Sequence, residues 1–122
     1  MPTVSQLNEI NMLIARVGLS DFLPTSPGYR CDDFHAQLIP LSEIQAPSGR
    51  TLVVDERANA ILVAISQSAP LPPVEVDEPP SRFATNCRFR LRDGFHRYHI
   101  SAALGFTHIP VAIKPFFDWN DL

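Results

Sequence analysis

Apolar and polar residues along the chain repeat with two different periods. Two stretches place apolar side chains on one face of a helix. The first is Leu7, Ile10, Ile14 and Val17, and the second is Ala58, Ile61, Leu62 and Ile65. Gly18 follows the first stretch, and Asp55 precedes the second as a helix cap. The pattern therefore predicts an amphipathic helix within the first 18 residues and another over residues 55–65.

Four shorter stretches are typical of β-strands, at residues 37–39, 71–76, 87–93 and 108–113. The third alternates strictly, which predicts one buried face and one cationic face. The buried face is Cys87, Phe89 and Leu91, and the cationic face is Arg88, Arg90 and Arg92. The proline-rich residues 77–86 predict a loop, so the second and third strands should form a hairpin. A short helix from about His96 to Leu104 should end at Gly105.

The order helix, strand, helix, strand, strand, helix, strand predicts one mixed α/β (α+β) domain. With 122 residues, of which 45% are hydrophobic and 19% charged, the chain is large enough to bury one core. No apolar run reaches the roughly 18 residues of a membrane span, and no secretory signal opens the chain. We therefore expect a cytoplasmic protein with no membrane partner.

Charge and cysteine content narrow the classes of function. Cys31 and Cys87 are too few and too far apart for a disulfide framework, so we expect free thiols. No cysteine or histidine spacing is typical of a metal site, and we expect none. The net charge of −3 offers nucleic acid no general attraction, which leaves only the local cationic face for such binding.

The residues with the most distinctive chemistry lie at the Asp93-Gly94 turn, between the third strand and the last helix. The first N–H groups of a helix have no internal partner and carry partial positive charge, so they favour an anion. Gly94 permits close approach of a ligand to the backbone, while His96 and Arg97 add donors. An ordinary turn, with Asp93 as the helix cap and Arg97 in solvent, explains the same residues equally well.

The stretch RFRLRDGFHRYHISAALGFTHIPVAI is similar to the signature end of the ParB/sulfiredoxin fold. That signature is a strand, a glycine-containing turn with an arginine, an alanine-bearing helix, Leu-Gly and Pro-Val. Upstream, LIPLSEI looks like the first strand and turn of the superfamily, the helix at 55–65 like its first helix, and PLPPVEV like its second strand. The resemblance implies a small mixed sheet with flanking helices over residues 35–115. Residues 1–34 would add an N-terminal helix and linker, and residues 116–122 an aromatic tail.

The turn takes several forms in this superfamily. In sulfiredoxins it reads Gly-Gly-Cys-His-Arg and binds ATP phosphates, and the cysteine performs the redox chemistry. Phe95 stands at the cysteine position here, which argues against sulfiredoxin activity. Partition ParB proteins carry Gly-Glu-Arg-Arg, which binds CTP phosphates, and continue into a helix-turn-helix domain that we do not expect within these 122 residues. The form Asp-Gly-x-His-Arg most resembles stand-alone ParB-like domains, including those labelled nucleases and a free-serine kinase.

The resemblance thus implies a nucleotide site, with ATP or CTP as the ligand and Mg²⁺ as its companion ion. Gly94, His96 and Arg97 would contact the phosphates. Arg50 loosely matches a further phosphate-binding arginine, although an ordinary surface position suits it as well. Asp93 either caps the helix, which we favour because this role needs no ligand, or holds Mg²⁺ or accepts a proton. In an enzyme of the phosphotransferase or nucleotide-hydrolysing class, Asp93 and His96 would be the catalytic residues.

Two other functions stay open at this point. A ParB-like DNA-binding or nuclease module would use the cationic face, and Arg90→Ala would weaken its salt-sensitive binding. A degenerate domain would bind a protein partner through the aromatic tail, by Phe116, Phe117 and Trp119. The same three side chains would otherwise pack back onto the domain.

Overall fold

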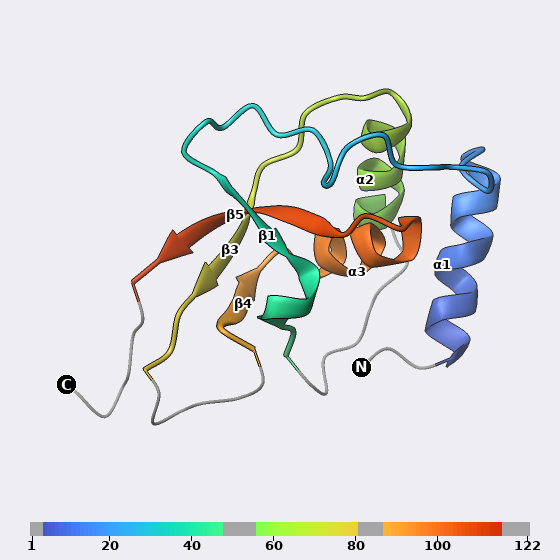
Figure 1. Ribbon diagram of the computed structural model, residues 1–122. Helices are drawn as coiled ribbons and strands as arrows, with labels where there is room; N and C mark the ends of the chain where they lie inside the picture. Colours follow the sequence, from blue (N-terminus) through green and yellow to red (C-terminus); the bar gives the residue numbers. More distant parts are fainter. Residues whose placement is uncertain (1–3, 48–55, 81–86, 116–122) are drawn as a thin grey trace.

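The computed structural model describes residues 4–47, 56–80 and 87–115, with side chains from residue 8 onward. Its elements in chain order are α1 (Val4–Arg16), β1 (Gln37–Pro40), a 3-10 turn η1 (Leu41–Glu43), β2 (Ile44–Gln45), α2 (Glu56–Ser66), β3 (Val74–Asp77), β4 (Phe89–Asp93), α3 (Phe95–Leu104) and β5 (His108–Lys114). The helices lie together to one side of the strands (Figure 1). The predicted mixed α/β domain with an extra N-terminal helix is confirmed.

Both helices predicted from apolar spacing are present. Their buried apolar side chains are Ile10, Leu13 and Ile14 in α1, and Ala58, Leu62 and Ile65 in α2. Gly18, two residues after the end of α1, has a left-handed φ of +80°, as expected of a residue that ends a helix. The side chain of Leu7 and the predicted cap Asp55 lie outside the described residues.

The strands form one sheet in the order β1-β5-β3-β4-β2. β3 pairs antiparallel with β4, which confirms the hairpin, and parallel with β5. β3 begins at Val74 rather than at residue 71 because Pro72 and Pro73 have no N–H for the ladder. The parallel pair of β2 with β4 was not predicted, because two residues are too few to show a period. Ile44 itself is buried, as expected.

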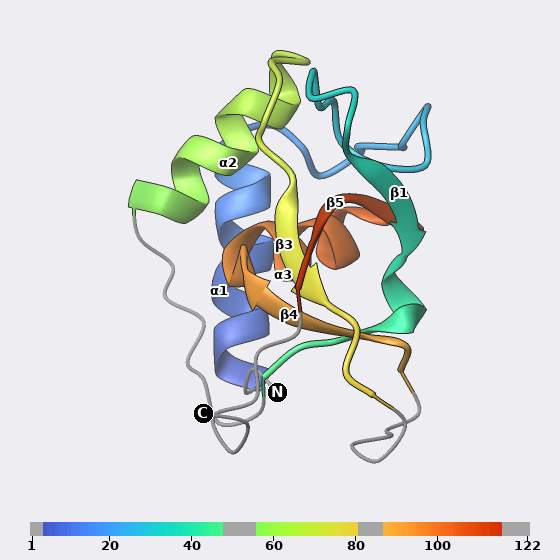
Figure 2. The ribbon, with the colours of Figure 1, turned by 90° about the vertical axis from the view of Figure 1, so that its left-hand side faces the viewer.

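The two edge strands of the sheet are neighbours along the chain. In a flat sheet β1 and β2 would lie about 19 Å apart, since strands are spaced by about 4.8 Å. The chain from Pro40 to Ile44 spans at most about 14 Å, so the sheet must curl until its edges approach each other. The hydroxyl of Tyr98 on α3 donates a hydrogen bond of 3.2 Å to the carbonyl oxygen of Ile44 and so stabilises the turn between β1 and β2. Figure 2 shows the strands turning around α3.

One hydrophobic core joins the helices to the sheet. Its members include Ile10 of α1, Leu62 of α2, Ile100 of α3, Val74 and Val76 of β3, and Phe89 and Leu91 of β4. The N-terminal helix therefore packs on the same core as the sheet. In residues 4–47, 56–80 and 87–115, no helix has the length and apolar character needed to cross a membrane.

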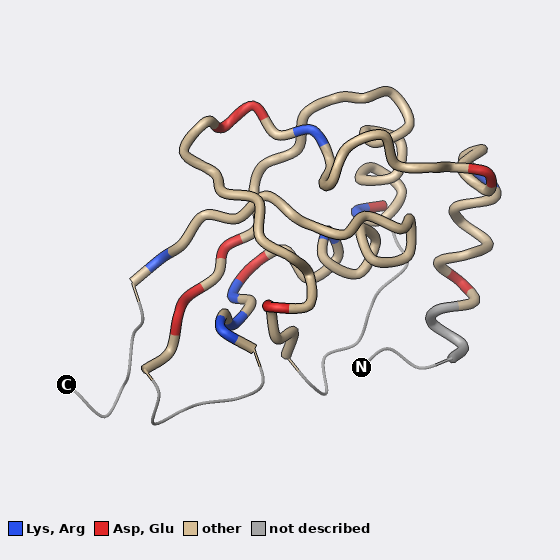
Figure 3. Tube along the Cα trace, viewed as in Figure 1, with Lys and Arg blue, Asp and Glu red and all other residues tan. Residues whose placement is uncertain are grey.

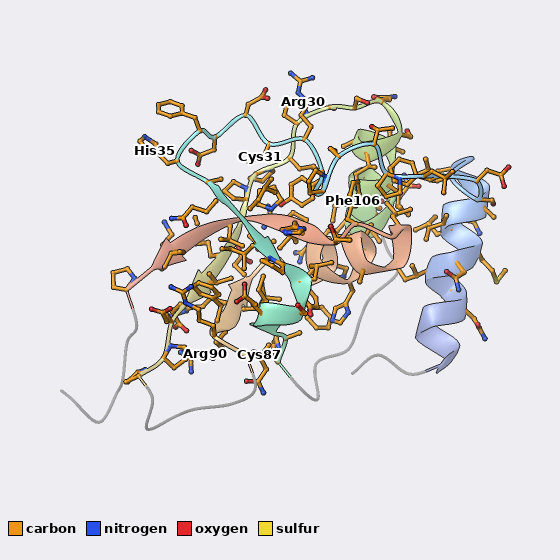
Figure 4. All side chains as sticks on the ribbon, in the orientation of Figure 1. Arg30, Cys31, His35, Cys87, Arg90 and Phe106 are labelled. Carbon is orange, nitrogen blue, oxygen red and sulfur yellow. The ribbon has the colours of Figure 1, made fainter. Side chains whose placement is uncertain are left out.

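The prediction that Cys87 shares the buried face of the third strand is wrong. β4 begins at Phe89, so Cys87 precedes the strand and is only partly buried, with its thiol 3.7 Å from the carbonyl oxygen of Ser42. Neither Cys31 nor Cys87 forms a disulfide, and the two residues stand well apart in the molecule (Figure 4).

Candidate functional site

The Asp93-Gly94 turn has the geometry that its sequence predicted. β4 ends at Asp93, Gly94 has a left-handed φ of +102°, and α3 begins at Phe95. A β-carbon at Gly94 would lie 2.4 Å from Cγ1 of Val74, which is closer than any real contact. Glycine is therefore needed here for two reasons, the backbone conformation and the close approach of β3.

The prediction that Asp93 caps α3 is wrong. Gly94 occupies the N-cap position, and no side chain donates or accepts a capping hydrogen bond there. Asp93 is instead the last residue of β4, one position before the N-cap. Its carboxylate is 66% exposed and lies 3.7 Å from the guanidinium of Arg97. The other prediction, that Asp93 binds a metal ion or accepts a proton, is not tested by this geometry.

A pocket of about 360 Å³ opens at this turn. It is lined by Arg57, Ala60 and Ile61 of α2, by Leu71 and Pro72 before β3, and by Asp93, Gly94, Phe95, His96 and Arg97 of the turn. Every residue that we predicted at the turn thus belongs to one cavity. Arg50 lies outside the described residues, as do Phe116, Phe117 and Trp119.

Arg97 is not in solvent, contrary to the alternative prediction. Its side chain is only 14% exposed, and its Nη1 donates a hydrogen bond of 3.1 Å to the carbonyl oxygen of Pro72. The Pro72 carbonyl uses one of the five N–H donors of the guanidinium. The protein therefore holds Arg97 at the pocket wall in a defined orientation.

The first turn of α3 forms another part of the pocket lining. The amide of Tyr98 donates to the Gly94 carbonyl at 2.9 Å and so makes the first hydrogen bond of the helix. The positive end of the helix dipole consequently lies at Phe95, His96 and Arg97, all of which line the pocket. His96 is half-buried there.

Phe95 turns its side chain into the core and is 2% exposed. Its ring contacts that of His99, with centroids 4.4 Å apart. A buried phenyl ring thus fills the position at which the resembled sulfiredoxin turn carries its cysteine. Burial also lowers the pKa of His99 to about 4, and its Nε2 is buried without a hydrogen-bond partner. His99 is a neutral packing residue rather than a part of the pocket.

Carboxylates at the end of the neighbouring strand β3 and directly after it pair with the arginines of the predicted cationic face. Asp77, whose side chain is fully buried, accepts hydrogen bonds from Arg90 at 2.8 Å and from Arg92 at 3.0 Å. Arg88 pairs with Glu78. Figure 3 shows the acidic residues of β3 beside the basic residues of β4. Arg90 lies at the end of the molecule opposite to Arg30 (Figure 4). None of the three arginines Arg88, Arg90 and Arg92 lines the pocket.

The sequence analysis missed one basic residue of the pocket, Arg57. The helical spacing could have placed Arg57 on the same face of α2 as two other pocket residues, because it precedes Ala60 by three residues and Ile61 by four. Only the position of α2 beside the turn shows that this face lines the pocket. Within the described ranges, no group of three or more His, Cys, Asp or Glu side chains is arranged to hold a metal ion.

Comparison with known proteins identifies the fold. No protein-family model matches the sequence, and neither does any curated protein. Among solved structures, sulfiredoxin from Arabidopsis thaliana matches with a TM-score of 0.53 and 24% identity, over 66% of this chain and 85% of that one. The C-terminally truncated chromosome-partitioning protein ParB from Caulobacter crescentus, complexed with CTP-gamma-S, matches with a TM-score of 0.52 and 16% identity. That match covers 68% of this chain and 46% of the ParB chain, so this chain spans less than half of that protein.

Proposed function

We propose that this chain, which has the ParB/sulfiredoxin-like fold, binds the phosphate groups of a nucleotide in the pocket between α2 and the start of α3. One observation carries the proposal. Arg57 and Arg97 reach a single cavity from two different helices, at the positive end of α3 and beside the left-handed Gly94. This combination of residues favours a ligand with several negative charges.

The phosphates would interact with the turn and the two arginines. Backbone N–H groups in the first helical turn and the helix dipole stabilise an anion. A guanidinium binds phosphate oxygens through two parallel hydrogen bonds, which a single ammonium group cannot do. The second cation, Arg57, adds another positive charge to the same cavity from a different helix. A triphosphate therefore suits the pocket better than inorganic phosphate does.

The remaining walls supply apolar surface for the nucleoside. Ala60 and Ile61 from α2 and Leu71 before β3 line the same cavity. Its volume of about 360 Å³ lies within the range of roughly 300–1,000 Å³ typical of small-molecule sites. The ParB protein with the same fold was solved with CTP-gamma-S, which supports a nucleotide as the class of ligand. ATP and CTP are the nucleotides that we propose, with Mg²⁺ accompanying them.

Asp93 and His96 extend the proposal from binding to catalysis. Both line the pocket, and the Asp93 carboxylate is exposed. A carboxylate beside a bound triphosphate is suited to hold Mg²⁺ or to accept a proton from an attacking hydroxyl or water. The imidazole of His96 would donate a hydrogen bond to the phosphates and so stabilise their negative charge. We propose phosphoryl transfer or nucleotide hydrolysis as the reaction class.

No observation favours DNA as the main ligand. Asp77 pairs with both Arg90 and Arg92, and Glu78 pairs with Arg88. Three arginines and two carboxylates leave this face a net charge of only about +1 with which to attract a phosphate backbone. DNA binding through these arginines stays a prediction and is included as an arm of the test below.

Titration with ATP, CTP and ADP, with and without Mg²⁺, tests the proposed function. We expect the amide resonances of residues 93–97 and of the first turn of α2 to shift, with a smaller response to ADP. Adenosine and cytidine, which lack phosphates, should bind much more weakly. Arg88→Ala serves as a matched control for Arg97→Ala, because Arg88 is exposed and outside the pocket. Absence of any change around Gly94 at millimolar nucleotide would overturn the proposal.

A further inference from the structure

The connection between α1 and β1, which the sequence predicted only as a linker, contacts the backbone of the pocket wall. Tyr29 of this connection is 5% exposed and belongs to the core. Its hydroxyl donates a hydrogen bond of 2.6 Å to the carbonyl oxygen of Pro72. Pro72 lines the pocket, and its carbonyl also accepts the hydrogen bond from Arg97 at 3.1 Å. Tyr29 and Arg97 thus share one acceptor.

This shared acceptor fixes two parts of the site at once. A carbonyl oxygen has two lone pairs, and here the phenol and the guanidinium each use one. Burial raises the pKa of Tyr29 above its ordinary value, so the hydroxyl stays protonated and continues to donate at any physiological pH. The Pro72 wall is consequently held in place even while Arg97 engages a ligand.

Two further hydrogen bonds tie the same connection to the segment before β3. The amide of Leu71 donates to the carbonyl oxygen of Arg30 at 2.9 Å. The side chain of Arg30 donates from Nη1 to the carbonyl oxygen of Ser68 at 3.0 Å. Figure 4 shows Arg30 next to this segment, which leads from α2 to β3. The N-terminal part of the chain therefore holds the segment from Ser68 to Pro72, of which Leu71 and Pro72 line the pocket.

We infer that Tyr29 is a positioning residue of the nucleotide site, which orients Arg97 and the Pro72 wall for phosphate binding. The inference rests on the proposed function and adds a role for a residue that precedes residues 35–115, the range of the sequence resemblance. A wall and a guanidinium that are already ordered lose less entropy on binding, so the site gains affinity from this preorganisation.

Tyr29→Phe removes only the hydroxyl and keeps the buried ring. We expect it to weaken ATP or CTP binding by roughly 3- to 10-fold, the effect of one lost hydrogen bond. Tyr98→Phe is the matched control, because the Tyr98 hydroxyl also contacts backbone carbonyls, those of Leu41 and Ile44, but lies outside the pocket. We expect Tyr98→Phe to lose about as much thermal stability as Tyr29→Phe but to bind nucleotide with unchanged affinity.

A second measurement makes the result independent of nucleotide binding. In the ligand-free protein, Tyr29→Phe should shift the Nε–H resonance of Arg97 and speed hydrogen exchange at the Leu71 amide, whereas Tyr98→Phe should change neither. Arg30→Ala, at an exposed position, should speed exchange at Leu71 without disturbing the core. If wild type binds nucleotide and Tyr29→Phe binds equally well, the inference fails while the proposed function stands. If no nucleotide binds wild type, the proposed function fails, and unchanged Arg97 and Leu71 signals would then reject the positioning role too.

Discussion

The carboxylate of Asp93, at the end of β4, lies 3.7 Å from the guanidinium of Arg97 in the first turn of α3, and both residues line the same pocket. Asp93 is exposed and Arg97 is nearly buried, so the pair joins a solvated anion to a fixed cation. An anionic ligand that enters the pocket must compete with Asp93 for Arg97. A divalent cation would reverse this relation, because the carboxylate would then bind the ion that accompanies the ligand.

Asp93→Asn distinguishes these two roles. Without Mg²⁺, the substitution removes a repulsive charge and should strengthen ATP or CTP binding roughly two- to fivefold, the range of an exposed ion pair. With Mg²⁺, the same substitution should weaken binding if Asp93 holds the ion. Calorimetric titrations in EDTA and in millimolar Mg²⁺ measure both effects. Equal affinity of wild type and Asp93→Asn under both conditions would contradict any role of this carboxylate at the site.

Gly94→Ala should destabilise the protein by about 2–5 kcal/mol, since it combines a left-handed conformation with a clash against Val74. Gly18→Ala is the natural control. Gly18 also has a positive φ, of +80°, but a β-carbon there would meet nothing within 4 Å. Gly18→Ala should therefore lower the free energy of unfolding only by the conformational cost, about 1–2 kcal/mol. Urea denaturation of the two variants gives both values, and equal losses would show that Val74 yields without cost.

Local features of the turn were predictable from the sequence, while contacts between distant segments were not. Gly94 and Gly105 both have the positive φ expected at the ends of α3, because the need for glycine is set by the few residues around it. Arg57 and Tyr29 lie 40 and 68 residues away from Arg97 along the chain. No periodicity relates them to the turn, and only the packing of α2 and of the α1–β1 connection brings them to it.

The arginines of β4 also show that the sequence predicts which side chains are exposed but not what they contact. Alternation correctly predicted that Phe89 and Leu91 would be buried and that Arg90 and Arg92 would face away from the core. It could not show that a carboxylate would lie between the two arginines. Asp77 was assigned to the loop after β3, but the strand extends to include it, and pairing with Arg90 then buries its side chain completely.

Asp77→Asn tests whether this pairing suppresses DNA binding. We expect wild type to bind duplex DNA weakly, because Asp77 offsets one of the two positive charges of Arg90 and Arg92. Loss of the Asp77 charge should strengthen binding at 50 mM salt and make it more salt-dependent, at a cost in stability of about 1–3 kcal/mol. Fluorescence anisotropy at several salt concentrations measures the slope. Tight wild-type binding that Arg90→Ala abolishes would instead support the DNA-binding function.

His99 should make stability depend on pH. Burial lowers its pKa in the folded protein to about 4, below the ordinary value of 6.5, so the folded state binds fewer protons than the unfolded state between these values. The stabilising contribution is complete above pH 6.5 and is lost as the pH falls towards 4. His99→Gln should reduce this loss, whereas His35→Gln, at an exposed position, should not. Urea midpoints measured from pH 4 to 7.5 test the difference, and parallel curves for wild type and His99→Gln would refute it.

Arg57→Ala should show how much of the nucleotide affinity comes from the phosphates and how much comes from the nucleoside. Arg57 lines the pocket from α2 and Arg97 lines it from α3, so we expect Arg57 to act on phosphates other than the one that Arg97 binds. Its loss should weaken triphosphate binding about 10-fold or more, as expected for hydrogen bonds to charged groups, while leaving the weak binding of the free nucleoside unchanged. Arg57→Lys keeps the charge but loses the two-pronged geometry, and should recover only part of the affinity. Affinities of ATP, ADP and adenosine for the three proteins, measured at one salt concentration, test this order. An equal effect of Arg57→Ala on adenosine and ATP would place Arg57 against the nucleoside and not against the phosphates.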